Sequence, residues 1–142
     1  MDEHTKREAL ETLAAEANYH QRQAQDIQNQ IQTLQSIESE INRTTDVLKN
    51  LKEKNTTLFS LGSGIFVKGE MKETNKLLLN VGANVLIETD ADGATKFLEG
   101  KKAELDQARD EMLQGMQTIS GRLREIDIEA RRMIEEAREH QH

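Results

Sequence analysis

The sequence predicts an α+β protein, mostly α, with two long helices that flank a central β region. Apolar residues recur at alternating intervals of three and four in both flanks of the chain, a spacing typical of coiled coils. Glycine, threonine and β-branched residues gather between the flanks, and most charged residues lie outside this middle segment. We therefore expect an N-terminal coiled-coil helix (residues 1–54), two β-hairpins (55–89) and a C-terminal coiled-coil helix (90–142).

The composition indicates a hydrophobic core that is not compact within one chain. Hydrophobic residues make up 35% of the 142 residues, charged residues make up 32%, and the aromatic residues are three Phe and one Tyr. A compact domain of this length usually has a richer apolar content. The shortfall predicts an elongated shape or a core completed by partner chains, because the heptad periodicity argues against disorder.

The composition also excludes several classes of protein. Without cysteine, the chain forms no disulfide and no cysteine-based zinc site. We expect a cytoplasmic protein without membrane contact, because no apolar run approaches the ~20 residues of a transmembrane helix and the N-terminus lacks a signal-peptide pattern. The net charge of −7 makes nucleic acid a poor partner, since phosphate binding requires a basic surface.

The first helix has signals for its start, its seam and its end. Thr5 and Glu8 fit a capping box, which predicts Thr5 as the N-cap. Lysines between residues 49 and 54 favour the C-terminal end of a helix, and Asn55 is a suitable stop. The predicted heptad positions are Leu10, Leu13, Ala17, His20, Ala24, Ile27, Ile31, Leu34, Glu38, Ile41, Thr45 and Leu48.

The second helix is expected to start at a cap formed by Thr89 or Asp90. One of its heptad rows is complete, whereas the other loses its phase in the first half of the helix, where Lys101 and Ala108 occupy it. Such a change of phase resembles a stutter. The complete row is Leu98, Leu105, Met112, Ile119, Ile126 and Met133, and the second row is Met116, Leu123, Ala130 and Ala137.

Both apolar stripes are too narrow to stabilise a lone helix, so we expect the two helices to pair. An antiparallel pair in which facing residue numbers sum to 146 aligns the strong rows, from Leu48 with Leu98 to Leu13 with Met133. The chain then turns at residue 73, in the middle of the β region.

The middle segment contains an internal repeat with a period of twenty residues. Residues 58–67 and 78–87 each consist of an apolar run, a turn centred on Gly62 or Gly82, and a second apolar run. This pattern is typical of a β-hairpin. Since isolated hairpins are marginally stable and leave open edges, we expect them to pair with another subunit. The predicted strands lie near residues 57–61, 65–71, 77–81 and 85–89.

The most specific motifs lie in residues 58–69 (LFSLGSGIFVKG), 81–88 (VGANVLIE) and 94–98 (ATKFL). Set between two long helices, they give a chain that resembles the α class of prefoldin subunits, a chaperone family of archaea and eukaryotes. Two positions depart from the family pattern: Ser60 stands where Pro is frequent, and Asn84 stands where Gly is frequent. Both lie at strand ends or turns, where these residues are tolerated.

The resemblance implies an ATP-independent holdase that captures non-native proteins at its distal coiled-coil tips and passes them to a group II chaperonin. It also implies a hexamer of two α and four β-class subunits, with α–α contact through the hairpins and a β-barrel built between subunits. The predicted assembly residues are Leu58, Phe59, Leu61, Ile65, Phe66, Val67, Leu78, Leu79, Val81, Val85, Leu86 and Ile87.

The tips, residues 1–20 and about 123–142, hold more apolar residues than one seam can bury. Ile128 and Ile134 lie off the heptad rows, which favours contact with apolar client segments, although a wider core stripe or scattered surface residues would give the same pattern. Gly115 and Gly121 either soften the helix below the tip or are simply tolerated. The predicted client-binding residues are Leu10, Leu13, Ala14, Tyr19, Leu123, Ile126, Ile128, Met133 and Ile134.

No pattern predicts catalysis, a cofactor or a metal ion. Residues 62–64 lack the ending of a P-loop, and residues 90–93 lack the bidentate Glu of a calcium loop. We expect His4, His140 and His142 to face solvent rather than bind a metal. The chain is therefore not expected to be an enzyme. The alternative function is a structural or tethering coiled-coil assembly protein without client binding.

Overall fold

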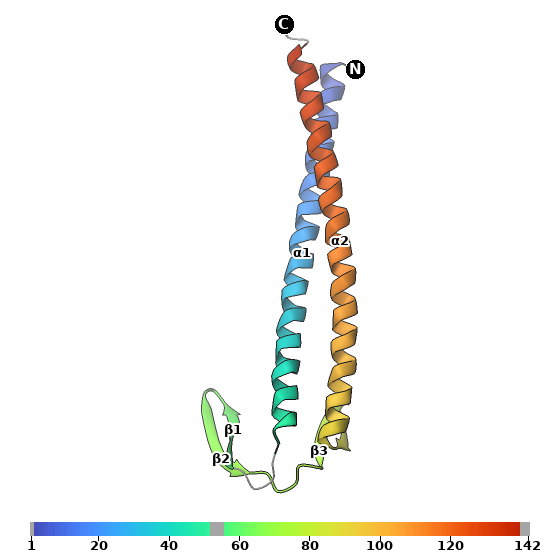
Figure 1. The fold of residues 1–142 in the computed structure, drawn as a ribbon. Coiled ribbons are helices and arrows are strands. Elements are labelled where there is room, and N and C mark those ends of the chain that lie inside the picture. The colour runs from blue at the N-terminus through green and yellow to red at the C-terminus, as the bar shows by residue number, and fades with distance from the viewer. Residues whose placement is uncertain (1, 52–55, 140–142) are drawn as a thin grey trace. The chain divides into compact units, whose positions relative to one another are not determined.

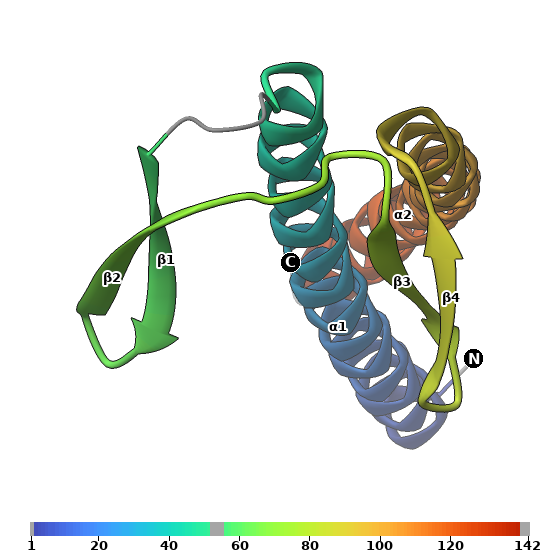
Figure 2. The same cartoon turned by 90° about the horizontal axis from the view of Figure 1, so that it is seen from below.

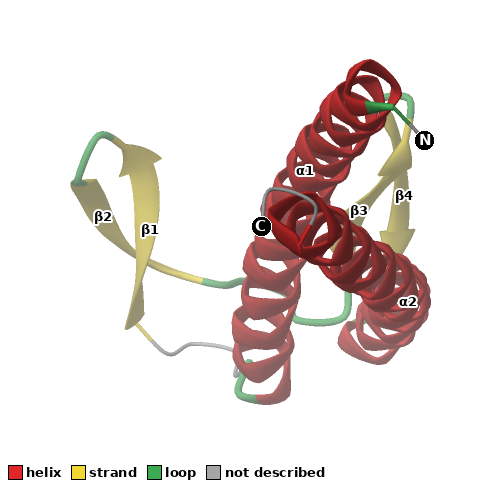
Figure 3. Cartoon of the chain, turned by 90° about the horizontal axis from the view of Figure 1, so that it is seen from above, coloured by secondary structure: helices red, strands yellow, loops and turns green. Residues whose placement is uncertain are grey.

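The computed structural model describes residues 2–51 and 56–139. The elements follow in the order α1 (Glu3–Lys49), β1 (Thr56–Gly62), β2 (Ile65–Glu70), β3 (Leu77–Gly82), β4 (Val85–Thr89) and α2 (Ala91–Glu139) (Figure 1). All four strands lie between the two helices in the sequence, and Figure 3 distinguishes helices from strands by colour. This confirms the predicted class of two long helices around two β-hairpins.

The chain forms two compact units, and they do not coincide with the three predicted segments. One unit combines residues 1–35 with residues 106–142, and the other contains residues 36–105. Each helix contributes to both units, because its residues pack against the other helix rather than along their own segment. In the first unit, the start of α1 and the end of α2 lie side by side (Figure 1).

The helices bury the predicted heptad rows. Every predicted position on α1 from Leu10 to Leu48 is buried or half-buried, and so is the complete row of α2 from Leu98 to Met133. On the second row of α2, Ala137 alone is exposed. A two-row seam of this kind is the coiled-coil pattern. The most deeply buried side chains are Leu13, Ile41, Ala94, Ile119 and Ile126.

The predicted change of phase in α2 is wrong at Lys101, although Ala108, the other residue of the predicted shifted row, is half-buried. Lys101 is exposed, whereas Lys102 and Arg109 are half-buried and continue the row of Met116 at intervals of seven. Long basic side chains can line a seam with their methylene stems while the charged ends reach solvent, so the row continues although its residues are polar. Lys102 Nζ also donates a hydrogen bond to Asn42 Oδ1 across the two helices, at 3.0 Å.

An aspartate caps the N-terminus of each helix. Asp2, not the predicted Thr5, caps α1, because the Thr5 amide donates a hydrogen bond to Asp2 Oδ1 at 2.7 Å. This bond holds the pKa of the Asp2 carboxyl below its usual value. Asp90 caps α2, as one of the two predicted candidates, and accepts a hydrogen bond from the Gly93 amide at 2.8 Å.

Helix α1 ends at Lys49, earlier than predicted. The side-chain amide of Asn50 donates a hydrogen bond to the Asp46 carbonyl at 2.9 Å and so satisfies one of the last carbonyls of the helix. Asn50 therefore fulfils the role predicted for Asn55. Residues 52–55, which include that predicted stop, lie outside the described residues.

The twenty-residue repeat extends to the pairing of the strands. β1 pairs with β2 and β3 pairs with β4, both antiparallel, in two separate sheets (Figure 2). Five of the six paired positions of the first hairpin recur twenty residues later, as Phe59 with Val67 and Leu79 with Ile87 illustrate, and the exception is Thr56 with Glu70. The observed strands begin and end within one residue of the predicted ones.

The two turns share one backbone geometry. The central residues of both turns have φ values from 50° to 79°, as the two-residue type I′ turn requires, and Asn84 adopts this conformation without a glycine. Before each turn the register shifts, and a side chain accepts a hydrogen bond from a glycine amide. Gly62 donates to Ser60 Oγ at 3.3 Å, and Gly82 donates to Asn80 Oδ1 at 2.9 Å.

Candidate functional site

The hairpins present the largest group of exposed apolar side chains. Among the predicted assembly residues only Leu79 is half-buried, and the other eleven are exposed. Leu78 is 72% exposed and Leu61 is 68% exposed, and a contiguous patch of such side chains marks an interaction surface. The exposed assembly residues are Leu58, Phe59, Leu61, Ile65, Phe66, Val67, Leu78, Val81, Val85, Leu86 and Ile87.

Both edges of each hairpin are open, and so are both faces of the first hairpin, whereas Leu77 and Leu79 are half-buried on one face of the second. Paired residues share a face, so Phe59 and Val67 lie on one side of the first hairpin while Ser60 and Phe66 lie on the other. Within the part of the chain that the structure describes, no third strand joins either sheet. The outer edges therefore retain backbone N–H and C=O groups that can pair with another chain.

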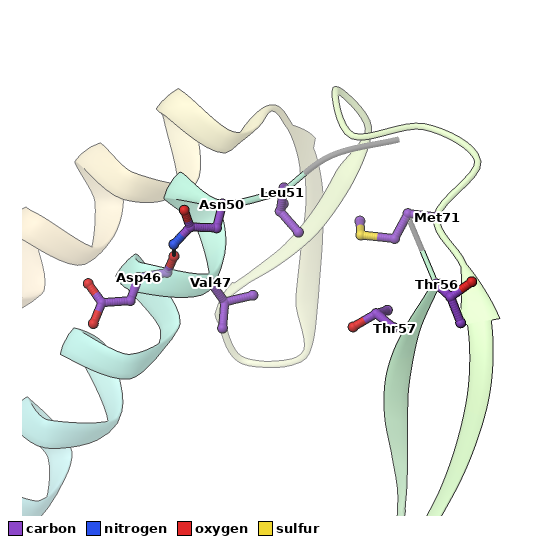
Figure 4. A pocket seen from close by; sticks show the side chains of 7 residues that line it. All are labelled: Asp46, Val47, Asn50, Leu51, Thr56, Thr57 and Met71. Carbon is purple, nitrogen blue, oxygen red and sulfur yellow. Dashed lines mark hydrogen bonds between the residues drawn. The ribbon is translucent and has the colours of Figure 1, made fainter. Parts of the chain in front are cut away.

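A hollow of about 420 Å³ lies beside the C-terminal end of α1 (Figure 4). Val47, Leu51 and Met71 give it an apolar lining, and Asp46 is its one carboxylate. No nucleophile with a neighbouring base lines it, so its chemistry suits contact with a partner side chain better than a reaction. The remaining lining residues are Asn50, Thr56 and Thr57.

The predicted client-binding residues fall into two groups by burial. Leu13 and Ile126 are 8% and 4% exposed, so they belong to the seam and are inaccessible while the helices are paired. Leu10, Leu123 and Met133 are half-buried in the same seam. The exposed residues of the set are Ala14, Tyr19, Ile128 and Ile134.

An ion pair joins the two helices in the unit of residues 1–35 and 106–142. Arg122 donates from Nε and Nη2 to the two carboxylate oxygens of Glu16, at 2.7 and 2.8 Å, in the bidentate geometry of a strong charge-assisted contact. Arg122 Nη1 also contacts Glu125 at 3.2 Å. The hydrogen bonds from Arg122 hold the pKa of Glu16 below its usual value, and those to Glu16 and Glu125 raise the pKa of Arg122.

Sequence reasoning missed this ion pair, although a signal for it was present. Glu16 and Arg122 each immediately precede a heptad position, Ala17 and Leu123, and charges that flank a seam often pair between helices. His20, the polar residue in the strong row of α1, lies beside the pair with Nε2 at 3.5 Å from Glu16 Oε1. The seam thus has a polar layer next to the tip.

Replacing Arg122 with glutamine is expected to lower the thermal stability of the tip at neutral pH. It is also expected to reduce the loss of thermal stability that the original chain shows as the pH falls. Since the pKa of Glu16 is lower in the folded chain, its contribution is complete above the usual glutamate pKa of about 4.3 and is lost as pH falls through the folded-state value. Thermal unfolding followed by circular dichroism between pH 3 and 7 measures both effects.

The control for this prediction is Arg131→Gln. Arg131 pairs with Asp127 one turn away on the same helix, and both side chains are largely exposed. Such a pair contributes little to stability. Equal losses in the two variants, or an unchanged acid dependence in Arg122→Gln, would contradict the role of the cross-helix pair.

The two glycines below the tip have different surroundings. Gly115 is half-buried toward the seam, where an added methyl group would lie 3.8 Å from Ile27 Cδ1, an ordinary contact distance. Gly121 is exposed, and a methyl group there would meet nothing within 4 Å. Both positions therefore have room for alanine.

The double change of Gly115→Ala and Gly121→Ala is expected to stabilise α2 by roughly 1 kcal/mol at each site, because alanine loses less backbone entropy in a helix. Thermal unfolding measures the gain in stability, and a client-capture assay on the same protein tests whether the glycines matter as a soft point. A stabilised chain with unchanged capture would remove the softening interpretation. A destabilised chain would contradict the packing described above.

Residues 2–51 and 56–139 contain neither a metal-binding cluster nor a membrane-spanning helix. No group of three or more His, Asp or Glu side chains is placed to hold a metal ion there. None of the helices described is apolar enough over a sufficient length to cross a membrane. His140 and His142 lie outside the described residues.

Comparison with known proteins shows one family. The family model "Prefoldin subunit" matches residues 20–136. The chain is similar to prefoldin subunit alpha of Methanobrevibacter smithii, at 27% identity over 85% of this chain and 84% of the relative. It is also similar to prefoldin subunit alpha of Pyrococcus horikoshii, at 31% identity over 70% of each chain.

A solved structure shares the fold. A chain of filamentous PFD from Methanocaldococcus jannaschii, determined by cryo-EM, aligns with a TM-score of 0.55 and 23% identity. The alignment covers 87% of this chain and 98% of the other. This likeness concerns the arrangement of helices and hairpins.

Proposed function

Because the chain belongs to the prefoldin family and to its α class, we propose that it is a subunit of an ATP-independent holdase that captures non-native proteins and delivers them to a group II chaperonin. The proposed complex contains two copies of this chain and four β-class subunits in the cytoplasm. The chain itself catalyses no reaction and needs no cofactor.

The observation that carries the proposal is the pair of open hairpins. Eleven exposed apolar side chains and four unpaired strand edges would be an aggregation hazard in a free monomer. Burial of this surface against hairpins of other subunits removes the hazard. A closed β-barrel between subunits is the arrangement that leaves no edge.

Client capture is proposed for the exposed apolar side chains near the termini. Tyr19 and Ile128 are 59% and 62% exposed, and Ile134 is 44% exposed. These side chains are not needed to complete the seam, which the heptad rows already fill. Non-native proteins expose apolar segments that can bury such side chains without any reaction.

The competing function is a structural tether in which the hairpins serve assembly alone. The two functions differ at the tips, because a tether has no use for spare apolar side chains there. The test is a light-scattering assay of a thermally denatured protein, with and without the chain assembled with a β-class subunit. We expect the complex to suppress aggregation without ATP. Unsuppressed aggregation in the presence of well-formed complexes would reject the holdase and favour the tether.

A further inference from the structure

The two hairpins are alike in register and opposite in charge at one position. Lys68 pairs with Leu58 in the first hairpin, and Glu88 pairs with Leu78 in the second, so the two charges occupy corresponding places twenty residues apart. Both side chains are exposed. Within the described residues, neither takes part in a hydrogen bond or an ion pair of its side chain.

The charges lie on two of the four strands. β1 and β3 contain no charged residue, β2 contains Lys68 and Glu70, and β4 contains Glu88. Since each sheet has only two strands, β2 and β4 are both open edges. A charge on an edge strand discourages pairing with a like charge and permits pairing with an opposite one.

Edge pairing can be compared in one antiparallel register. For this comparison we take the register in which Val67 of one copy lies opposite Ile87 of the other, because the two residues occupy corresponding places in the repeat. When β2 of one copy meets β4 of another in this register, Lys68 and Glu88 become diagonal neighbours on the same face, within reach of long side chains. β2 against β2 would instead bring Lys68 to Lys68, and β4 against β4 would bring Glu88 to Glu88.

We propose that Lys68 and Glu88 direct β2 of one copy of this chain onto β4 of a second copy. The inference rests on the proposed function in that it assumes assembly through the hairpins. The inference adds that β2 pairs with β4, and that the charges of Lys68 and Glu88 favour this pairing over pairing of like strands. In a twofold dimer the contact occurs twice. The edges of β1 and β3, which lack charge, remain open to subunits of another kind.

The test is a charge-reversal cycle in the full chain, co-expressed with a β-class subunit. Lys68→Glu and Glu88→Lys each turn both contacts of the dimer from attraction to repulsion and are expected to weaken α–α association by roughly tenfold. The double variant restores opposite charges and is expected to return within about twofold of the original chain. Native mass spectrometry over a dilution series measures the association between copies of this chain.

Lys72→Glu is the matched control, because Lys72 is exposed and lies outside the strands. It is expected to leave association unchanged. The inference would be overturned if the single reversals left the association between copies unchanged. It would also be overturned if the double variant associated as weakly as the two single effects predict when they are added.

The absence of cysteine allows a second measurement. Chains that carry Lys68→Cys are mixed with chains that carry Glu88→Cys and treated with a short bifunctional maleimide. Cross-links are expected between the two variants and not within either variant alone. Links between two copies of the same variant would show pairing of like strands and contradict the proposal.

These outcomes separate the inference from the holdase function. Complexes that follow the charge cycle but fail to suppress aggregation would reject the holdase and keep the strand pairing. Active complexes that ignore the cycle would reject the strand pairing alone. A chain that forms no complex with a β-class subunit and no dimer would reject both.

Discussion

A chain with Phe66→Ser and Leu86→Ser is expected to lose its assembly with other subunits while it keeps its own fold. The two residues correspond in the hairpin repeat, and they are 58% and 57% exposed in the single chain. Their replacement removes little burial from the monomer, because more than half of each side chain already faces solvent.

The expected effect on assembly is large. Full burial of a Phe or Leu side chain is worth about 1.5–3 kcal/mol, and roughly half of it is still to be gained at each position when the hairpins pack. Two positions in each of two copies sum to several kcal/mol, which corresponds to an association weakened by about a hundredfold or more. Mass measurement of the co-expressed complex and a dilution series test this directly.

Ile37→Ser provides the control for the hairpin variant. Ile37 is an apolar residue of α1, 40% exposed and outside the hairpins. We expect this variant to assemble normally, with a thermal unfolding curve close to that of the original chain. Intact complexes with the Phe66→Ser and Leu86→Ser chain would show that the hairpin faces are not the assembly surface.

The helices and strands could be predicted because their periodicities report burial directly. Glu38 and Thr45 illustrate this, since both are polar, both occupy predicted heptad positions, and both are half-buried. Inference of burial from apolar periodicity failed in the first half of α2, where the residues of the second heptad row are polar. Lys102 and Arg109 continue the second row of α2, but an apolar pattern does not include them. The predicted stutter was the result.

The ends of the helices were less predictable because several residues compete for the same role. Asp2 and Thr5 are both good N-caps three residues apart, and the helix gains almost one more turn by starting at the first. Asn50 and Asn55 compete in the same way at the other end of α1. Local sequence does not decide such a choice, since the energies of the alternatives differ by little.

The division of the tip residues between seam and surface could be predicted from the heptad rows, because Ile126 lies on a row and Ile128 lies off it. Ile126 and Ile128 are two residues apart, yet one is 4% exposed and the other is 62% exposed. The contact of Glu16 with Arg122 was not predicted, because the heptad positions that the two residues flank do not by themselves say which residues face each other across the seam. Heptad rows repeat every seven residues, so their spacing alone leaves the register between two helices open to a shift.

A chain with Ile128→Ser and Ile134→Ser is expected to lose client contact at its tip without losing stability. Both side chains are exposed, so the seam keeps its packing and the unfolding temperature of the complex should change little. If each isoleucine buries against a client, its loss costs about 1.5 kcal/mol, and together they weaken capture at this tip by roughly a hundredfold.

The measurement must report on the tip of this chain alone, so that client contacts with other subunits of the proposed complex are not counted. Tyr19→Cys supplies a single attachment point for a photoreactive cross-linker on the same unit. The yield of cross-linked client is expected to fall in the Ile128→Ser and Ile134→Ser background. Leu113→Ser, another exposed apolar position of α2, is the matched control.

The opposite result would also be informative about mechanism. If cross-linking to a client survives the loss of Ile128 and Ile134, the contacts must come from residues that the seam now buries, with Leu13 and Ile126 foremost. Those side chains become available only when the helices separate near the tip. Capture would then rise in Arg122→Gln, which releases the cross-helix ion pair, whereas capture by surface residues predicts no such gain.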